Sequence, residues 1–311
     1  MEYSGSPDAL IELPLSNNGS FPAEAAKRYP TRSNPPKGQL LKWIGNKQRF
    51  AEAIIQHFPP SYRTYFEPFL GSGAVLAAMA PVRAEGSDVF GPLIDIWQTL
   101  RFDPAQLKVW YSRRHAEIDL TSKQDAYRKA QDDYRDFPNG ADLLFLSRTC
   151  YGGVVRFRQS DGYMSTPCGP HTPMTPEKFA TRVDDWALRV RGTTFFNRSF
   201  EAALERAGPG DIVYCDPPYS HSQTILYGAQ SFSLSSLMEA IGKAKRRGAF
   251  VALSIDGSKK SGNQLCDITI PHGLFAREEM LNVGRSMLRR FQMGGETLES
   301  ELVRDRLLLT D

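Results

Sequence analysis

The residues best suited to chemistry form the tetrapeptide Asp216-Pro217-Pro218-Tyr219, directly after an apolar run at 211–215. A carboxylate and a neighbouring backbone carbonyl can both accept hydrogen bonds from an amino group on a planar base. The lone pair of such an amino group is otherwise delocalised into the ring, which makes the nitrogen a poor nucleophile. Two prolines fix φ at about −65° and stiffen the turn, so the carbonyl of the first one is aimed. The aromatic ring that follows can stack on the same base. The pattern predicts electrostatic activation of an aromatic amine, with no metal ion and no covalent nucleophile.

A structural turn, in which the aspartate only caps the backbone, is the other interpretation of this tetrapeptide. Its position after a buried strand favours the catalytic one. If the activated amine is to be methylated, a methyl donor must lie in line with it, at about 3–3.5 Å. The rest of the chain should therefore provide a pocket for such a donor.

A second segment, FEPFLGSG at 66–73, predicts a turn that binds a nucleoside. Gly71 and Gly73 allow a tight turn and a close approach of the backbone to a ligand. Leu76 stands where a nicotinamide dinucleotide fingerprint requires a third glycine, which argues against an NAD-dependent enzyme. Asp88, at the expected end of the next strand, is placed to hold ribose hydroxyls.

A third segment, LKWIGNK at 41–47, precedes an expected helix. Lys47 could pair with the carboxylate of a methionine moiety, and Trp43 could line the same pocket. Lysines in such a segment are more often surface charges, so the segment alone decides little.

The hydrophobic pattern predicts an α/β fold with a mostly parallel sheet covered by helices on both faces. The expected strands cover or end at 62–69, Asp88, 211–215 and 248–255, and the expected helices cover 74–80 and 235–247. Residues 104–136 are charged and helical in character. Residues 148–170 predict a β-hairpin or long loop.

Composition sets wide bounds: 311 residues, 41% hydrophobic, with a net charge of +3. This suits a globular protein and is compatible with a nucleic-acid partner. No apolar run is long enough for a membrane span, and no signal peptide begins the sequence, so we expect a cytoplasmic protein. The four cysteines are too scattered for zinc or a disulfide scaffold, which favours reduced thiols.

With these segments assembled, the chain resembles the Dam-type DNA adenine N6-methyltransferases with the alpha-type order of motifs. The similarity runs over most of residues 40–310 through LKWIGNK, FEPFLGSG, SDVF, a central insert, SF, DPPY, SFS and a tail containing GRSMLRRF and VRDRLLLT. The family implies a Rossmann-like fold that binds S-adenosylmethionine, with an inserted helical and β-hairpin domain that recognises DNA. It implies site-specific methyl transfer to adenine N6 in duplex DNA, in a prokaryotic or phage-encoded protein, with or without a companion restriction endonuclease.

The resemblance also implies roles for individual residues. The catalytic positions are Asp216, Pro217, Pro218 and Tyr219. The cofactor-binding positions are Trp43, Lys47, Phe69, Gly71, Gly73, Asp88, Ser199, Phe200 and Asp216. Ser199 departs from the family, in which many relatives carry an acid there. A serine would accept a hydrogen bond from the adenine of the cofactor more weakly.

Adenine N6 lies inside the duplex, so an enzyme of this kind must flip the nucleotide out. The resemblance places the contacts with DNA at Arg148, Tyr151, Val154, Arg156 and Arg158. Tyr151 matches an aromatic that enters the base stack, and Val154 and Arg156 match positions that touch bases. Arg148 and Arg158 suit phosphate contacts. An ordinary exposed basic hairpin is the alternative. Gly152 and Arg158 replace the usual Asn, so the target sequence stays open.

The domain prediction is a mobile arm at 1–36, a catalytic domain at 37–90 and 193–311, and a target-recognition insert at 91–192. Lys27, Arg28 and Arg32 of the arm could contact DNA, although a tail without a role is the simpler interpretation. Two other functions stay open: methylation of cytosine N4 or of an RNA base, and DNA binding without catalysis on a methyltransferase scaffold.

Overall fold

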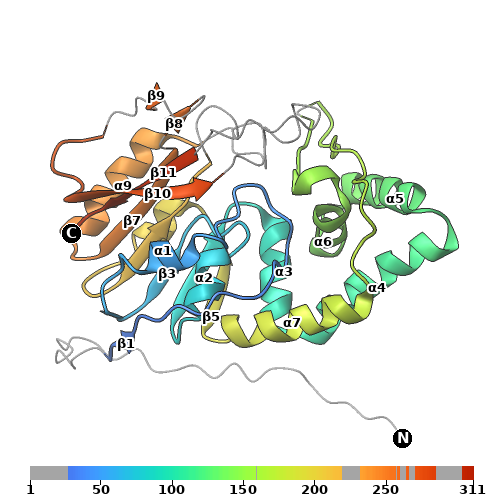
Figure 1. The fold of residues 1–311 in the computed structure, drawn as a ribbon, viewed down its shortest axis with the longest axis horizontal. Helices are drawn as coiled ribbons and strands as arrows, with labels where there is room; N and C mark the ends of the chain where they lie inside the picture. Colours follow the sequence, from blue (N-terminus) through green and yellow to red (C-terminus); the bar gives the residue numbers. More distant parts are fainter. Residues whose placement is uncertain are drawn as a thin grey trace, which may run out of the picture.

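The computed structural model describes residues 27–158, 160–218, 232–256, 258–259, 264–265, 270–284 and 303–311. A sheet of seven strands in the order β10-β11-β7-β6-β3-β4-β5 crosses this part of the molecule (Figure 1). Its strands are β3 (Tyr65–Glu67), β4 (Ala84–Asp88), β5 (Thr193–Asn197), β6 (Ile212–Cys215), β7 (Phe250–Asp256), β10 (Arg277–Gly284) and β11 (Val303–Leu309). Strands β3 to β7 are parallel, while β11 pairs antiparallel with both β7 and β10.

The described helices are α1 (Ala51–Ile55), α2 (Ala74–Met79), α3 (Gly91–Phe102), α4 (Pro104–Leu120), α5 (Lys123–Asp136), α6 (Gly140–Thr149), α7 (Pro176–Val190), α8 (Phe200–Leu204) and α9 (Leu234–Arg246), with a short 3-10 turn η1 (Tyr151–Gly153). Two small antiparallel pairs join β1 (Tyr29–Pro30) to β2 (Ser61–Tyr62) and β8 (Ser258–Lys259) to β9 (Gln264–Leu265). The predicted strands and helices of the α/β part are confirmed within a few residues. Of the two tail segments, VRDRLLLT forms β11, whereas GRSMLRRF lies outside the described residues beyond its first residue.

Helices cover both faces of the sheet, and the strands alternate accordingly. In β7, Phe250 and Ala252 belong to one hydrophobic cluster, and Val251 and Leu253 belong to the other. The first cluster lies under α1, α2, α3 and α7, and the second lies under α8 and α9. A parallel sheet needs this double cover because its strands are apolar on both faces. The predicted doubly covered α/β fold is confirmed.

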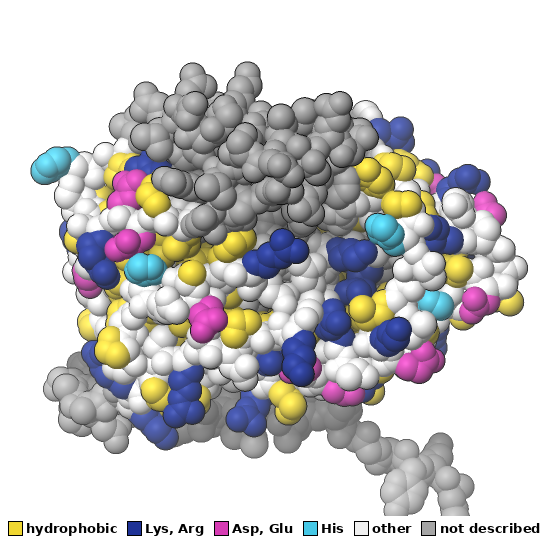
Figure 2. Space-filling view, viewed as in Figure 1, with side chains coloured by type: hydrophobic (Ala, Val, Ile, Leu, Met, Phe, Trp, Pro, Cys, Tyr) yellow, Lys and Arg dark blue, Asp and Glu magenta, His cyan; other side chains and the backbone are white. Residues whose placement is uncertain are grey.

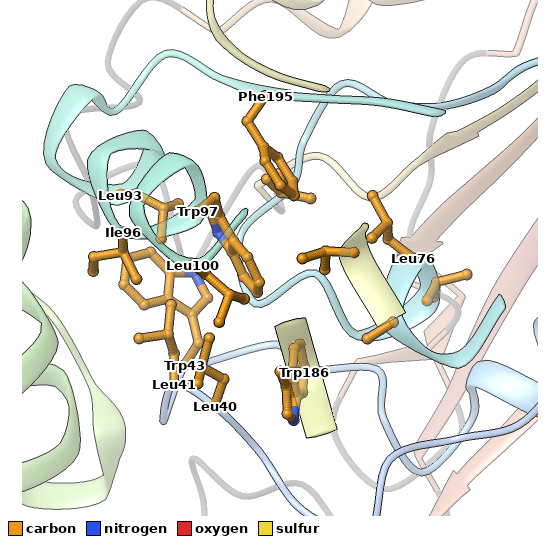
Figure 3. Packing of buried hydrophobic residues seen from close by; sticks show 14 of the residues in the cluster. Leu40, Leu41, Trp43, Leu76, Leu93, Ile96, Trp97, Leu100, Trp186 and Phe195 are labelled. Atoms are coloured by element: carbon orange, nitrogen blue, oxygen red, sulfur yellow. The ribbon is translucent and has the colours of Figure 1, made fainter. Parts of the chain in front are cut away.

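Helix α3 is fastened to the sheet by aromatic packing (Figure 3). The Trp97 ring stacks on Phe195 of β5 at 5.7 Å between centroids and lies 5.7 Å from the ring of Trp186 on α7. Helix α3, which the domain prediction places in the insert, therefore packs directly on the sheet. At its end the Asp103 side chain accepts a hydrogen bond from the Gln106 amide and caps α4.

Helices α4, α5 and α6 form a separate lobe beside the sheet (Figure 1). A half-buried Arg114 holds the lobe together through ion pairs with Asp133 (2.8 Å), Glu117 (3.1 Å) and Asp142. Because each carboxylate lies on a different part of the lobe, the guanidinium links α4 to α5 and α6. The predicted helical character of 104–136 is confirmed.

The predicted mobile arm ends earlier than residue 36. Tyr29 and Pro30 pair with β2, and the Asn34 amide donates to the Ala78 carbonyl (2.7 Å). Residues 29–36 therefore pack beside β2 and the end of α2, while 1–26 lie outside the described residues. The guanidinium of Arg28 lies beside Gly210, just before β6 begins. That edge is opposite to the Asp216 turn, so the structure does not support the predicted DNA contact of Arg28.

Candidate active site and nucleic-acid interface

The site lies at the carboxyl ends of β3 and β6, which are neighbours in the sheet. From β3 the chain passes through α2 to β4 on one side, whereas β6 lies on the other side. Such a reversal of strand order opens a crevice at the carboxyl edge of a parallel sheet. Asp216, Pro217 and Pro218 follow β6 and line a pocket there together with Phe69 and Gly71. Tyr219 lies outside the described residues.

The two predicted cofactor-loop glycines have different tasks. Gly71 lines the pocket at φ +45°, and a Cβ atom there would lie 3.3 Å from Nε1 of Trp43. Gly73, at φ +57°, packs against Trp97, where a Cβ would lie 2.9 Å from the indole. Trp97 also donates from Nε1 to the Gly71 carbonyl (3.2 Å). Gly73 thus shapes the turn and is not among the residues that line the pocket, so its predicted cofactor contact stays a prediction.

Asp88 ends β4 at the rim of the same pocket. Its two carboxylate oxygens accept from the backbone N–H groups of Gly71 and Phe90, each at 3.1 Å. Burial raises the pKa of Asp88, and these backbone donors oppose that rise. Each oxygen retains a further lone pair, so the carboxylate can still accept from vicinal hydroxyls.

An aromatic wall, formed by Phe69, Phe200 and Phe232, closes one side of the pocket. The Phe69 and Phe200 rings stack at 5.2 Å, and Phe232 meets each of them edge-on at 5.9 Å. Ser199 also lines the pocket, but its hydroxyl accepts from the Ala202 amide (3.4 Å) and caps α8. The sequence analysis did not single out Phe232 or Glu201, the residue after Phe200, although both line the pocket. The SFS motif carried the only signal for Phe232.

Lys47 is buried at 6% exposure and lies between two acids. Its ammonium is 3.0 Å from an oxygen of Asp216 and 3.6 Å from an oxygen of Asp305 on β11. The structure thus brings together Lys47 and Asp216, which the sequence placed in one pocket from segments 169 positions apart. Asp305 was missed, because only the antiparallel addition of β11 beside β7 carries it to this place.

Glu67, inside the FEPFLGSG segment, was also missed as a functional candidate. Its carboxyl lines the pocket, is buried, and accepts from the Tyr65 hydroxyl at 2.6 Å. Burial raises its pKa to about 8; the Asp216 charge adds to that rise and the hydroxyl opposes it. Glu67, Asp88 and Asp216 thus line the pocket with Lys47, whose ammonium also pairs with Asp305.

The predicted DNA-contacting hairpin forms over 150–168, with isolated bridges between Cys150 and Cys168 and between Phe157 and Met164. Tyr151 (38% exposed), Arg156 and Arg158 point outward, and Val154 is half-buried. Arg158 pairs with Asp161 at 2.6 Å and lies over the ring of Tyr163. The structure therefore presents four of the five predicted side chains on one loop.

Arg148 is the exception, because it is buried beside the hairpin and is not exposed on it. It lies in α6 at 6% exposure, and its guanidinium donates to the carbonyls of Gln39 (3.1 Å) and Leu40 (2.7 Å). These bonds hold α6 to the segment before α1, so Arg148 does not project from the loop as the other four side chains do. Its position one turn before the hairpin gave no local sign of this burial.

The hairpin is linked through Phe90 to the pocket that Asp216 lines. This ring, which lines the pocket, lies 6.5 Å from that of Trp43 and 5.8 Å from that of Phe157 in the hairpin. On its other side, Phe157 stacks on Tyr134 of α5 at 5.4 Å. A continuous run of aromatic rings therefore connects the hairpin with the pocket.

Three cysteines of the described part, Cys150, Cys168 and Cys215, have free thiols. Among the described residues, no group of three or more His, Cys, Asp or Glu side chains is arranged to hold a metal ion. No helix in that part has the length and apolarity needed to cross a membrane.

The chain is similar to several DNA adenine methylases. The chain is 30% identical over 187 residues to the retron Ec67 DNA adenine methylase of Escherichia coli, covering 58% of this chain and 63% of the relative. It is 28% identical over 229 residues to the DNA N-6-adenine-methyltransferase of Escherichia phage P1, covering 70% and 30%. A Vibrio cholerae DNA adenine methylase is 28% identical over 232 residues, covering 69% and 80%. The match thus spans less than two thirds of the first two relatives.

Among solved structures, the rRNA methyltransferase AviRa of Streptomyces viridochromogenes covers 88% of this chain with a TM-score of 0.37 and 14% identity. That likeness carries no argument about the present chain. The family model of the D12 class N6 adenine-specific DNA methyltransferases matches residues 43–252, which is more than half of the sequence. The order of its motifs and the geometry of the crevice agree with this match, and the chain belongs to the D12 class N6 adenine-specific DNA methyltransferase family.

Proposed function

We propose that this protein transfers a methyl group from S-adenosylmethionine to N6 of an adenine flipped out of duplex DNA. The observation that carries the proposal is the juxtaposition of the Asp216-Pro217 turn with the Gly71 loop and Asp88 in one pocket. In the reaction, the N6 lone pair forms the new bond to carbon, the carbon–sulfur bond breaks, and N6 loses a proton.

The acceptor side of this chemistry belongs to the turn after β6. The Asp216 carboxylate and the Pro217 carbonyl can accept from the two N6 hydrogens, which favours a more nucleophilic nitrogen. Asp216 now pairs with Lys47 at 3.0 Å, so an arriving amino group competes with that ammonium. If the amino group displaces Lys47 from Asp216, Lys47 can still pair with Asp305, which lies 3.6 Å away.

The residues present fit S-adenosylmethionine. Its sulfonium supplies the activated methyl group. Asp88 would hold the ribose, the aromatic wall would hold the adenine ring, and Lys47 would pair with the carboxylate of the methionine moiety. Gly71 adopts φ +45° beside Trp43, where a Cβ atom would lie 3.3 Å from the indole nitrogen, so a larger residue there would strain the turn. The surplus of acids suits the two positive groups of this cofactor.

Duplex DNA is the proposed substrate, held by the hairpin through Tyr151, Val154, Arg156 and Arg158. Tyr151 could fill the gap that a flipped nucleotide leaves, and Arg156 could read a guanine in the major groove. A cytoplasmic location and a companion restriction endonuclease both stay predictions. Co-expression that protects DNA from one restriction enzyme would support the latter.

The test compares the protein with its Asp216→Ala variant on unmethylated duplex DNA supplied with S-adenosylmethionine, followed by mass analysis of the nucleosides. We expect N6-methyladenine from the protein and a loss of at least a hundredfold in rate from the variant, with DNA affinity largely retained. Asp119→Asn, an exposed position on α4, is the matched control. An Asp216→Ala variant that remains active would contradict the assigned role.

The same measurement separates the alternatives. Methylcytosine in place of methyladenine would identify an N4-cytosine enzyme, and activity on RNA alone would identify an RNA-base enzyme. Absence of any binding of S-adenosylmethionine in calorimetry, with DNA binding intact, would favour a non-catalytic protein on a methyltransferase scaffold.

A further inference from the structure

A basic trough lies outside the cofactor pocket, between the segment before α1 and helix α7. Its charged lining residues are Lys37, Lys42, Arg49, Arg148 and Arg182, and none of its lining residues is acidic. The cations come from segments far apart in sequence, so the trough is built by the fold. Its volume is about 480 Å³, enough for a phosphodiester and several waters, since a water in the liquid occupies about 30 Å³.

These positive charges are not neutralised by the described protein. Lys37 and Arg49 are exposed. Within the described ranges, none of the four residues Lys37, Lys42, Arg49 and Arg182 forms an ion pair with a carboxylate. Burial lowers the pKa of Lys42, and the neighbouring Arg148 lowers it further. Like charges collected without counter-charges cost free energy, and an anion placed among them recovers it.

A second, independent observation comes from the floor of the trough. The Nε atom of Arg148 is buried and has no hydrogen-bond partner among the described residues, although its other nitrogens donate to backbone carbonyls and to Met174. A buried donor left unpaired costs about 1–3 kcal/mol. An acceptor bound in the trough, directly or through a water, would satisfy it.

The trough is adjacent to the hairpin. Gly153 of the hairpin packs so closely on Lys42 that a Cβ atom would lie 2.9 Å from that residue's own Cβ. The next residue, Trp43, lines the cofactor pocket. Figure 2 shows Lys and Arg side chains gathered on the part of this face between the sheet and the helices of the insert. A duplex contacted by the hairpin would therefore carry one of its backbones past the trough.

We propose that this trough binds the phosphodiester backbone of the DNA substrate, as an anchor separate from the base-reading hairpin. The inference rests on the proposed function for its ligand, but it concerns residues that the hairpin does not include. Contacts with phosphates position a protein on a duplex without reading sequence. The trough thus sets the register from which the hairpin selects its base.

The experiment measures the salt dependence of binding to a labelled duplex by fluorescence anisotropy, from low to moderate KCl. Each phosphate contact contributes about 0.9 to the slope of log affinity against log salt concentration. The double variant Lys37→Gln/Arg49→Gln should therefore lower the slope by about 1.8 and weaken binding equally on all sequences. The control, Arg83→Gln/Arg191→Gln, removes two exposed arginines at the start of β4 and β5, on the opposite edge of the sheet.

An unchanged slope in the trough variant overturns the proposal, as does an equal change in the control. A trough that binds inorganic phosphate while the slope stays unchanged also overturns it, because the ligand is then not DNA. Far-ultraviolet circular dichroism of both variants checks that each is folded. The proposed function fails separately, if the unaltered protein binds duplex DNA with the expected slope yet transfers no methyl group.

Discussion

Lys47 shows how much a single charged residue depends on its neighbours. Alone in the sequence it resembles a surface lysine, yet it is buried between Asp216 and Asp305. Its ammonium pairs with the Asp216 carboxylate at 3.0 Å and so helps to hold that side chain in the pocket. An acidic turn without such a cation would be costly to bury, since several acids already crowd the pocket.

The titration of Glu67 gives a prediction at this scale. Its pKa of about 8 in the folded protein lies above the ordinary value of 4.5, so between these pH values the folded state holds a proton that the unfolded chain has released. Raising the pH through this window therefore removes stability, by at most about 1.4 kcal/mol per pH unit. Glu67→Gln should flatten the fall in unfolding free energy between pH 5 and pH 8.

Urea denaturation at several pH values measures this difference. Glu52→Gln, an exposed position on α1, serves as the control and should follow the unaltered protein. Identical pH profiles for Glu67→Gln and the unaltered protein would show that the carboxyl is already ionised in the folded state at neutral pH.

At the scale of elements, the hairpin behaves as a supported loop. Its inner side is held by α5, where Tyr127 donates to the Thr166 carbonyl (2.8 Å) and Gln131 donates to the Met164 carbonyl (2.6 Å). Because these bonds fix the backbone of the hairpin, the exposed side chains of Tyr151 and Arg156 project from a rigid loop. A base-reading side chain needs such a frame, because hydrogen bonds to base edges depend on orientation.

Arg156→Ala tests the role of this element. If Arg156 reads one base pair, the variant should lose about 1–3 kcal/mol of discrimination at that position alone, measured by methylation rates on a set of single-base target variants. Arg158→Ala, a predicted phosphate contact, provides the comparison and should weaken all targets alike. Uniform weakening by Arg156→Ala would assign it to a phosphate instead.

On the scale of the whole molecule, the pocket collects residues from six stretches of the chain. They come from the segment before α1, from the ends of β3, β4 and β6, from the start of α8, and from Phe232 just before α9. A ligand that contacts all of these stretches links them and so stabilises the folded state. Binding at one hundred times the dissociation constant adds about 2.7 kcal/mol to the unfolding free energy.

Asp88→Asn should reduce this stabilisation by S-adenosylmethionine. A tenfold loss of affinity lowers it by about 1.4 kcal/mol at the same ligand concentration. Urea denaturation with and without the cofactor measures the effect, and Asp119→Asn is again the control. Full stabilisation of the Asp88→Asn variant would remove Asp88 from the cofactor site.

The sequence alone determined the α/β class, the strand-turn-helix units and most of the pocket. These features depend on short spacings: glycines that must adopt positive φ at Gly71 and Gly73, an acid at the end of β4, and prolines that stiffen the turn at Asp216. Local chain geometry requires these residue types wherever the chain goes next. The Dam-type resemblance drew on the same segments and was confirmed.

Only the tertiary structure decided which charges are buried and which face a ligand. Arg148 and Arg158 look alike in sequence, yet one holds backbone carbonyls below the surface and the other is exposed beside Asp161. Asp305 reaches Lys47 only through the pairing of β11 with β7. Burial and pairing of charge depend on contacts between segments far apart in sequence, which no local pattern records.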